Sequence, residues 1–261
     1  MCLIVLAWKA RADLPLAVAA NRDEWRDRPS EPAHWWPDDP QLLAGRDLEA
    51  GGTWMGITQG GRFAAVTNFR DPSERRSSAR SRGMLVTELL LGPDSPHDFL
   101  TRLAPRSNQY NGFNLIAGDG DTLWYYSSRE DSPREIQPGV HALSNHLLDE
   151  PWPKVVNGRE RMRKALLEAD PVPGLFELLA DRSPVGDSHL PRTGVGIEWE
   201  RRLSSALITG ADYGTRASTV LTIDAKGNAR FEERVLGPIG EVVHVTVDGE
   251  AASLDASATA A

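Results

Sequence analysis

The 261-residue chain carries a net charge of −8, with 40% hydrophobic and 25% charged residues, a composition typical of a globular domain with its own core. Its acidic balance argues against a general nucleic-acid binder, and its single cysteine excludes an intrachain disulfide. One short apolar run opens the chain with no basic segment before it. We therefore expect no signal peptide, no stable membrane insertion and a cytoplasmic location.

The first seventy residues predict two β-hairpins. Cys2–Trp8 and Leu16–Ala20 flank a turn at Lys9–Asp13, and Trp54–Thr58 and Phe63–Asn68 flank a Gly-Gly turn. The apolar runs are nearly continuous rather than alternating, so we expect strands that are covered on both faces.

Helices and further strands follow in the rest of the chain. Ser95 and Pro96 are typical of a helix N-cap and first position. We expect helices at Gly83–Leu91, Pro96–Leu103, Pro153–Ala169 and Val172–Leu179. Strands are expected at Phe113–Ala117, Thr122–Ser127, Val140–Asn145, Ala217–Ile223, Ala229–Leu236 and Val242–Val247. The Pro/Gly-rich stretch Asp181–Arg202 predicts no element.

Strands at both ends of the chain, with helices between them, predict two sheets in a layered α+β fold. Residues 1–248 are expected to form a single domain. The small, Ala-rich residues 249–261 are expected to form a flexible tail.

Cys2 directly follows the initiator methionine. Methionine aminopeptidases remove Met1 when the next side chain is small, which leaves a chain that begins with a thiol and a free α-amine on one residue. The thiolate is a nucleophile and the amine can act as its general base. The alternative interpretation is a small buried hydrophobe at the start of a strand.

The tetrad Asn21-Arg22-Asp23-Glu24 directly follows the second predicted strand. Because the hairpin turn spans Lys9–Asp13, Cys2 is expected to pair roughly with Asn21, which places the tetrad and Cys2 at the same end of the sheet. A carboxylate or guanidinium there can hold the amine or thiolate in a reactive geometry. A capped turn with a local ion pair is the alternative.

An arginine-rich segment, residues 70–82, contains five arginines in thirteen residues. It is either a solvated loop or a loop that draws an anionic group, a carboxylate or phosphate, toward a nearby pocket. Arg70 and Arg82 of this segment are expected to contact the substrate, as is Arg22 of the tetrad. His141 and His146 suggest no third ligand, so no metal site is expected.

The order of several short motifs identifies a family resemblance. A Met-Cys start followed by the tetrad resembles the NRDE family, also called the Transport-and-Golgi-organization family. The same resemblance extends through Gly51-Gly52-Thr53-Trp54-Met55-Gly56, Thr67-Asn68-Phe69-Arg70, Ser81-Arg82-Gly83, Tyr110-Asn111-Gly112-Phe113-Asn114-Leu115, His141-Ala142-Leu143-Ser144-Asn145 and Tyr213-Gly214-Thr215-Arg216-Ala217-Ser218-Thr219.

The family in turn looks like the N-terminal-nucleophile (Ntn) hydrolases, with a four-layer αββα sandwich, and within them the penicillin V acylase and bile salt hydrolase branch. This resemblance implies that Asp23 orients the Cys2 nucleophile, that Asn145 and Asn68 donate to the oxyanion, and that Arg216 supports the cysteine. In that branch an arginine stands three residues before the aspartate, whereas Ala20 occupies this position here.

The resemblance implies an N-terminal-cysteine amidohydrolase or acyltransferase that acts on a small-molecule amide and needs no cofactor. The alternative is a non-catalytic carrier of haem or of lipid or acyl-CoA ligands. Trp54 then serves as a wall for an acyl chain or a flat ring, unless it only packs the core.

Overall fold

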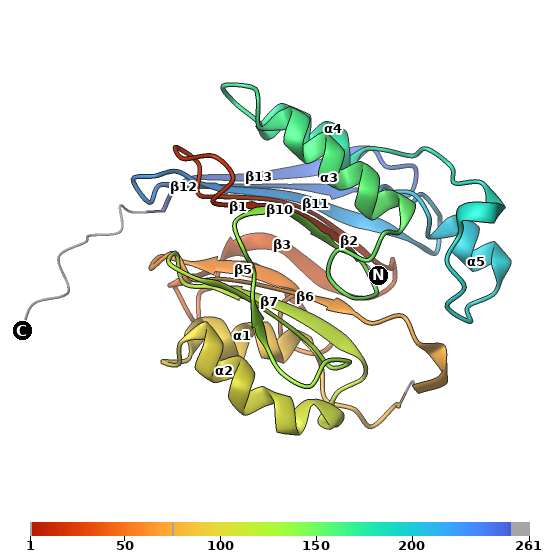
Figure 1. The fold of residues 1–261 in the computed structure, drawn as a ribbon, viewed down its shortest axis with the longest axis horizontal. Helices are drawn as coiled ribbons and strands as arrows, with labels where there is room; N and C mark the ends of the chain where they lie inside the picture. The colour runs from red at the N-terminus through yellow and green to blue at the C-terminus, as the bar shows by residue number, and fades with distance from the viewer. Residues whose placement is uncertain (1, 75, 252–261) are drawn as a thin grey trace, which may run out of the picture.

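Two antiparallel sheets form the centre of the protein, whose structure, a computed structural model, describes residues 2–74 and 76–251 (Figure 1). The six-stranded sheet has the order β10 (Gly139–Leu143), β1 (Cys2–Trp8), β2 (Leu16–Trp25), β11 (Tyr213–Ile223), β12 (Ala229–Leu236) and β13 (Val242–Ala251). The seven-stranded sheet has the order β3 (Ser30–Trp35), β4 (Leu42–Asp47), β5 (Met55–Thr58), β6 (Phe63–Asn68), β7 (Phe113–Gly118), β8 (Leu123–Ser127) and β9 (Arg134–Glu135).

Helices cover the outer face of each sheet (Figure 1). Helices α3 (Pro153–Ala165) and α4 (Val172–Leu179) pack on the six-stranded sheet, and α1 (Gly83–Leu91) and α2 (Pro96–Leu103) pack on the seven-stranded sheet. The remaining helical segments are α5 (Ile197–Arg202) and the 3₁₀ turns η1 (Pro72–Glu74), η2 (Ala104–Gln109) and η3 (Asp187–His189). No helix within the described ranges is long and apolar enough to cross a bilayer.

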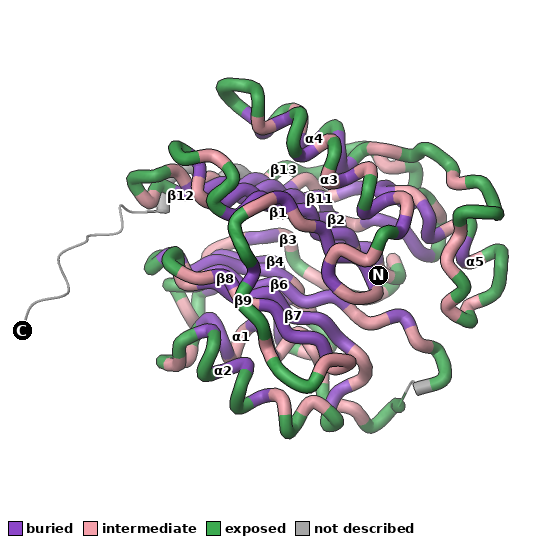
Figure 2. Tube along the Cα trace, in the orientation of Figure 1, coloured by how far each residue is buried: buried purple, intermediate pink, exposed green. Residues whose placement is uncertain are grey.

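The alternation of β1 shows why the fold has four layers. Ile4 and Leu6 enter the core between the two sheets, whereas Leu3 and Val5 pack against the helices on the outer face. A strand that is buried on both faces needs an unbroken apolar sequence, as predicted. Figure 2 shows the resulting burial, with the sheets largely buried and the helix ends and loops exposed. The predicted α+β fold with two antiparallel sheets is confirmed.

Several element boundaries differ from the predictions. Strand β2 continues to Trp25, because β11 pairs with it as far as Tyr213 opposite Trp25, so the tetrad lies within a strand rather than after one. Helix α3 ends at Ala165, four residues early. Strands β3 and β4 were not expected. Proline is unusual inside a strand, and Pro32 lies within β3, beside an irregularity in the pairing of β3 with β4.

Two further differences concern the C-terminal half of the chain. The stretch Asp181–Arg202, for which no element was predicted, contains η3 and α5. Strand β13 runs to Ala251, so residues 249–251 of the predicted tail are in a strand. Residues 252–261 of that tail lie outside the described residues.

Candidate active site

Cys2 lies at the start of β1 and lines a cleft of about 400 Å³. Its partner across the hairpin is Arg22, one residue beyond the predicted Asn21. The cleft wall also includes the predicted residues Asp23, Asn68, Trp54 and Arg82, together with Arg22 itself. These side chains come from β1, β2, β6, the chain before β5 and the end of the arginine-rich segment. The two sheets therefore bring together residues that are distant in the sequence.

Asp23 is buried and held by two hydrogen bonds. Thr215 Oγ1 donates a hydrogen bond to its Oδ1 at 2.7 Å, and the Tyr213 hydroxyl donates to its backbone carbonyl at 3.2 Å. Both partners come from β11, which pairs with β2 at this point. Burial raises the pKa of Asp23, and the charges of Lys154 and Arg70 and the Thr215 hydrogen bond oppose that rise.

The Cys2 thiol is in an environment that disfavours its thiolate. Burial raises its pKa, and the negative charge of Asp23 raises it further. A hydrogen bond from the backbone N–H of Asp23 and the positive charge of Arg22 act in the opposite direction. Asp23 therefore acts on the pKa of the cysteine in two opposite ways, through its carboxylate and through its backbone N–H.

Asn145 and Asn68 are joined to each other close to Cys2. Asn145 Nδ2 donates to the carbonyl of Asn68 at 3.0 Å, and the hydroxyl of the preceding Ser144 donates to the Cys2 carbonyl at 3.2 Å. Thr67 Oγ1 donates to the Ser144 carbonyl at 2.8 Å, which links the two sheets. Asn68 lines the cleft, whereas Asn145 is fully buried behind it. One of the two N–H donors on Asn145 Nδ2 is therefore committed to Asn68.

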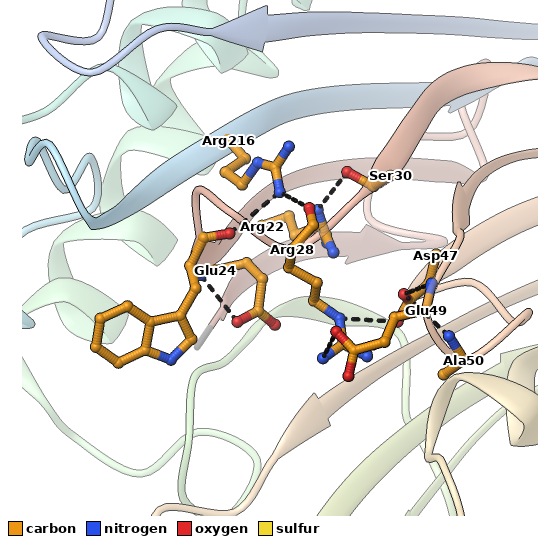
Figure 3. Close-up of polar contacts among 9 residues, drawn as sticks. Arg22, Glu24, Arg28, Ser30, Asp47, Glu49, Ala50 and Arg216 are labelled. Carbon is orange, nitrogen blue, oxygen red and sulfur yellow. Dashed lines mark hydrogen bonds and ion pairs between the residues drawn. The ribbon is translucent and has the colours of Figure 1, made fainter.

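Arg22 and Trp54 form a stacked pair in the cleft wall. The Arg22 guanidinium lies 4.2 Å from the ring centre, and its Nη1 donates to Ser30 Oγ at 3.2 Å. Gly45 leaves the space for the indole, because a β-carbon at this position would collide with the ring. Nearby, Arg28 is paired with Asp47 at 2.8 Å (Figure 3).

Arg216 is not part of the cleft wall. It occupies a bulge in β11, where the pairing with β2 shifts between Thr215 and Ala217. Its Nη1 donates to the carbonyls of Trp25 and Arg28, which fastens the turn between β2 and β3 (Figure 3). The structure thus connects Arg216 to the backbone that carries the tetrad, and not directly to the cysteine.

The arginine-rich segment divides into a buried and a cleft-lining part. Arg70 is buried, forms an ion pair with Glu200 at 2.8 Å and stacks over Trp152, so the expected substrate contact is not available to it. Arg76, Arg80 and Arg82 all line the cleft. Arg75 lies outside the described residues.

Motif glycines and asparagines hold this segment against the cleft. Thr53 N–H donates to the carbonyl of Gly83 at 3.3 Å, and a β-carbon on Gly52 would collide with the Gly83 backbone. Asn111 forms a reciprocal pair with the backbone of Arg76, donating at 2.9 Å and accepting at 2.8 Å. The close approach of the backbones at Gly52 and Gly83 explains why the motifs that contain them need glycine at these positions.

Two residues near the site were missed in the sequence. Thr215 belongs to the quoted Tyr213–Thr219 motif, yet its role depends on a strand pairing that the motif alone does not reveal. Lys154 is buried at the second position of α3, and its Nζ donates to the Leu203 carbonyl at 2.9 Å. A lysine in the first turn of a helix normally indicates solvent exposure, so no sequence signal marked it.

Comparisons with known proteins agree with the motif order. The family model described as Transport and Golgi organisation 2 matches residues 1–238. The chain is 34% identical to the mouse (Mus musculus) Transport and Golgi organization 2 homolog and 36% identical to the Bos taurus homolog. Each alignment covers 90% of this chain and 92% of the relative. The Drosophila melanogaster protein is 26% identical, with 87% and 89% covered.

Among solved structures, a Caenorhabditis elegans N-acylethanolamine-hydrolyzing acid amidase ortholog aligns at a TM-score of 0.45 and 10% identity, over 84% of this chain and 92% of that one. The family match over residues 1–238 and the relatives above 30% identity agree with each other. The chain belongs to the Transport and Golgi organisation 2 family.

Proposed function

We propose that the protein is an N-terminal-cysteine amidohydrolase or acyltransferase that acts on a small-molecule amide. The observation that carries the proposal is the convergence of Cys2 and Asp23 at the cleft. Cys2 and Asp23 line the same cleft, the charge and the backbone of Asp23 both act on the pKa of the thiol, and the Asp23 carboxylate is fixed by Thr215. A nucleophile needs a fixed neighbour to orient it and an open space for its substrate, and both meet at this point.

The reaction begins after removal of Met1, which lies outside the described residues. The free α-amine of Cys2 takes the thiol proton, and the sulfur attacks the amide carbonyl to form a tetrahedral intermediate. The C–N bond then breaks as the amine delivers the proton to the leaving nitrogen, which leaves a thioester on Cys2. Water completes a hydrolysis, and a second amine or alcohol completes a transfer.

The oxyanion of the intermediate needs donors close to the sulfur. We assign this role to Asn68, which lines the cleft, and to Asn145, which is buried directly behind it and has one further N–H on Nδ2 beyond its hydrogen bond to the Asn68 carbonyl. Donors of this type typically contribute about 100- to 1000-fold in kcat. Arg22 and Trp54, stacked in the wall, are assigned to substrate contact, and Arg82 with them.

A carrier of haem or of lipid or acyl-CoA ligands is the second candidate. It is favoured by the arginines of the cleft wall, which suit a carboxylate or phosphate, and by the apolar indole of Trp54 in the same wall. A carrier needs no free amine at Cys2 and no thioester, so the two candidates differ in their chemistry.

The test compares two forms of the protein with a fluorescent β-lactam, a strained amide. The native form is first checked by intact mass for the loss of Met1. In the second form a leucine inserted between Met1 and Cys2 keeps the methionine in place, so the thiol remains but the amine is blocked. We expect a covalent adduct on Cys2 of the native form only, with Cys2→Ala as the negative control.

Two results contradict the enzyme. One is retention of Met1 in the native protein. The other is equal labelling of both forms, because the amine then has no part in the reaction. Ligand binding that survives Cys2→Ala, without any adduct on the native form, supports the carrier instead.

A further inference from the structure

Lys154 is a buried lysine behind the nucleophile. It is 6% exposed, and its Nζ donates to the neutral carbonyl of Leu203. Within the described part of the chain it makes no direct ion pair, unlike Arg70 nearby, which is paired with Glu200. Burying an ammonium without a paired anion is unfavourable, and burial lowers the pKa of Lys154 to about 8.

The charges that act on Lys154 come from four different elements. Asp23 on β2 and Cys2 on β1 stabilise its charged form, as does Glu200 on α5, whereas Arg70 after β6 opposes it. Asp23 is the largest of the charges that keep the lysine protonated. The coupling is reciprocal, because the charge of Lys154 lowers the pKa of Asp23 against the rise caused by burial.

The surrounding backbone fixes the lysine in this position. Asn21 ties both the end of α4 and the chain after α5 to the six-stranded sheet, because its Nδ2 donates to the carbonyls of Leu179 at 2.9 Å and of Ala206 at 2.7 Å. Lys154 donates to Leu203, at the start of the same chain segment after α5. Asn21 and Asp23 are two residues apart in β2 and therefore lie on the same face of the sheet. Together these hydrogen bonds hold the buried ammonium on the side of the sheet to which Asp23 belongs.

We propose that Lys154 is a positioning residue whose buried ammonium keeps the Asp23 carboxylate ionised, and therefore able to hold the α-amine of Cys2. The inference rests on the proposed function. Lys154 itself does not touch the substrate, since it does not line the cleft that contains Cys2. Arg70 contributes less to keeping Asp23 ionised, because the negative charge of the adjacent Glu200 offsets the positive charge of Arg70.

The sign of the effect follows from the charges. Removing the ammonium destabilises ionised Asp23, so its pKa rises further and a smaller fraction is ionised at a given pH. The acid side of the pH profile for β-lactam acylation of Cys2 then moves to higher pH. We expect a shift of about one pH unit, which is about a tenfold lower rate on that side of the profile.

The experiment measures the Asp23 carboxyl directly and the acylation separately. The ¹³C carboxyl resonance of Asp23, assigned by its loss in Asp23→Asn, is titrated in the full-length mature protein with and without Lys154→Met. Lys164→Met is the matched control, because Lys164 is an exposed lysine on the same helix, with its side chain 71% exposed. Lys154→Arg keeps the charge and is expected to restore the titration. A cavity of about 120 Å³ beside Lys154 offers room for the larger group.

Each outcome decides the inference. A rise in the Asp23 pKa in Lys154→Met alone, reversed in Lys154→Arg, supports it. An unchanged Asp23 titration, or an equal rise in Lys164→Met, overturns it. If Lys154→Met fails to fold, Lys154→Gln is used, since it retains a donor for Leu203 without the charge. A wild type that is never acylated, while its Asp23 still responds to Lys154, refutes the enzyme but leaves the coupling in place.

Discussion

At the scale of single residues, Asp23 has two opposite effects on Cys2. Its negative charge raises the pKa of the thiol, whereas its backbone N–H stabilises the thiolate. The carboxylate therefore cannot serve to generate thiolate. Its contribution to the proposed reaction must be orientation of the α-amine, which is where a carboxylate fixed by Thr215 is useful.

This distinction predicts a split between two reactions in the Asp23→Asn variant. Acylation of Cys2 by the β-lactam is expected to fall by about 100-fold, because the amine loses its orientation. Alkylation by iodoacetamide, which needs only the thiolate, is expected to stay the same or to become faster, since the opposing charge is gone. Both rates are measured by intact mass on the same samples. A parallel fall in both reactions means that Asp23 acts through the fold or the thiolate, and contradicts the orienting role.

At the scale of the elements, a buried acid connects the two sheets. Glu233 on β12 accepts from the backbone N–H of Ala33 on β3 at 2.7 Å and from Thr219 Oγ1 on β11 at 3.1 Å. Burial raises the pKa of Glu233, although these two hydrogen bonds and the charge of Arg22 lower it. The folded protein therefore holds a proton on this group more tightly than the unfolded chain does.

Glu233→Gln is accordingly predicted to stabilise the protein at neutral pH. In the wild type, the stability from protonated Glu233 is present below the unfolded pKa, close to 4.5, and is lost as pH rises through the higher folded value. The amide in the Glu233→Gln variant does not ionise, so the variant keeps this stability as the pH rises. We expect the two proteins to differ little near pH 4 and the variant to gain about 1 kcal/mol in unfolding free energy by pH 8. Urea unfolding across this range measures the difference.

Glu177→Gln on α4 is the control, because this glutamate is exposed. A wild type that equals or exceeds Glu233→Gln in stability at pH 8 refutes the prediction. It would mean that the ionised carboxylate and its two hydrogen bonds outweigh its desolvation.

The individual strands also show how much of the fold and of the candidate site the sequence alone could predict. Apolar runs and turn residues identified the first hairpin, and through it the neighbourhood of Cys2 and Asp23. The tetrad looked like a turn because Asn and Asp favour turns, but β11, which lies about 190 residues later in the chain, pairs with it and extends β2 through it. The burial of Arg70 depends in the same way on Glu200, 130 residues away, and no local pattern contains that information.

At the scale of the whole molecule, the short motifs gather at one end of the two sheets. The chain has a net charge of −8, yet Arg76, Arg80 and Arg82 line the cleft with Arg22. Carboxylates offset some of this charge, since Arg28 pairs with Asp47 and Glu49, and Arg80 pairs with Glu88. We propose that the arginine-rich wall attracts anionic groups to Cys2 against the repulsion of the molecule as a whole.

Two reagents of nearly equal size measure this local field without any assumption about the substrate. Iodoacetate is an anion and iodoacetamide is neutral, and both alkylate the Cys2 sulfur. A positive cleft raises the ratio of the iodoacetate rate to the iodoacetamide rate, and salt lowers it. We expect the combined variant Arg76→Gln and Arg80→Gln to reduce the ratio about threefold at low salt, in line with a fraction of a kcal/mol for partly exposed charges. At 0.5 M salt the wild type and the variant are expected to agree.

The combined variant Arg163→Gln and Lys164→Gln is the matched control, because it also removes two positive charges, from the exposed side of α3 and away from the cleft. If this control reduces the ratio as much as the cleft variant does, the net charge of the protein sets the local field. The arginine-rich wall then has no specific part in it. If neither variant changes the ratio at low salt, the paired carboxylates already cancel the arginines, and recruitment of anions by this segment is refuted. A reduction confined to the cleft variant and abolished by salt leaves local attraction by Arg76 and Arg80 as its cause.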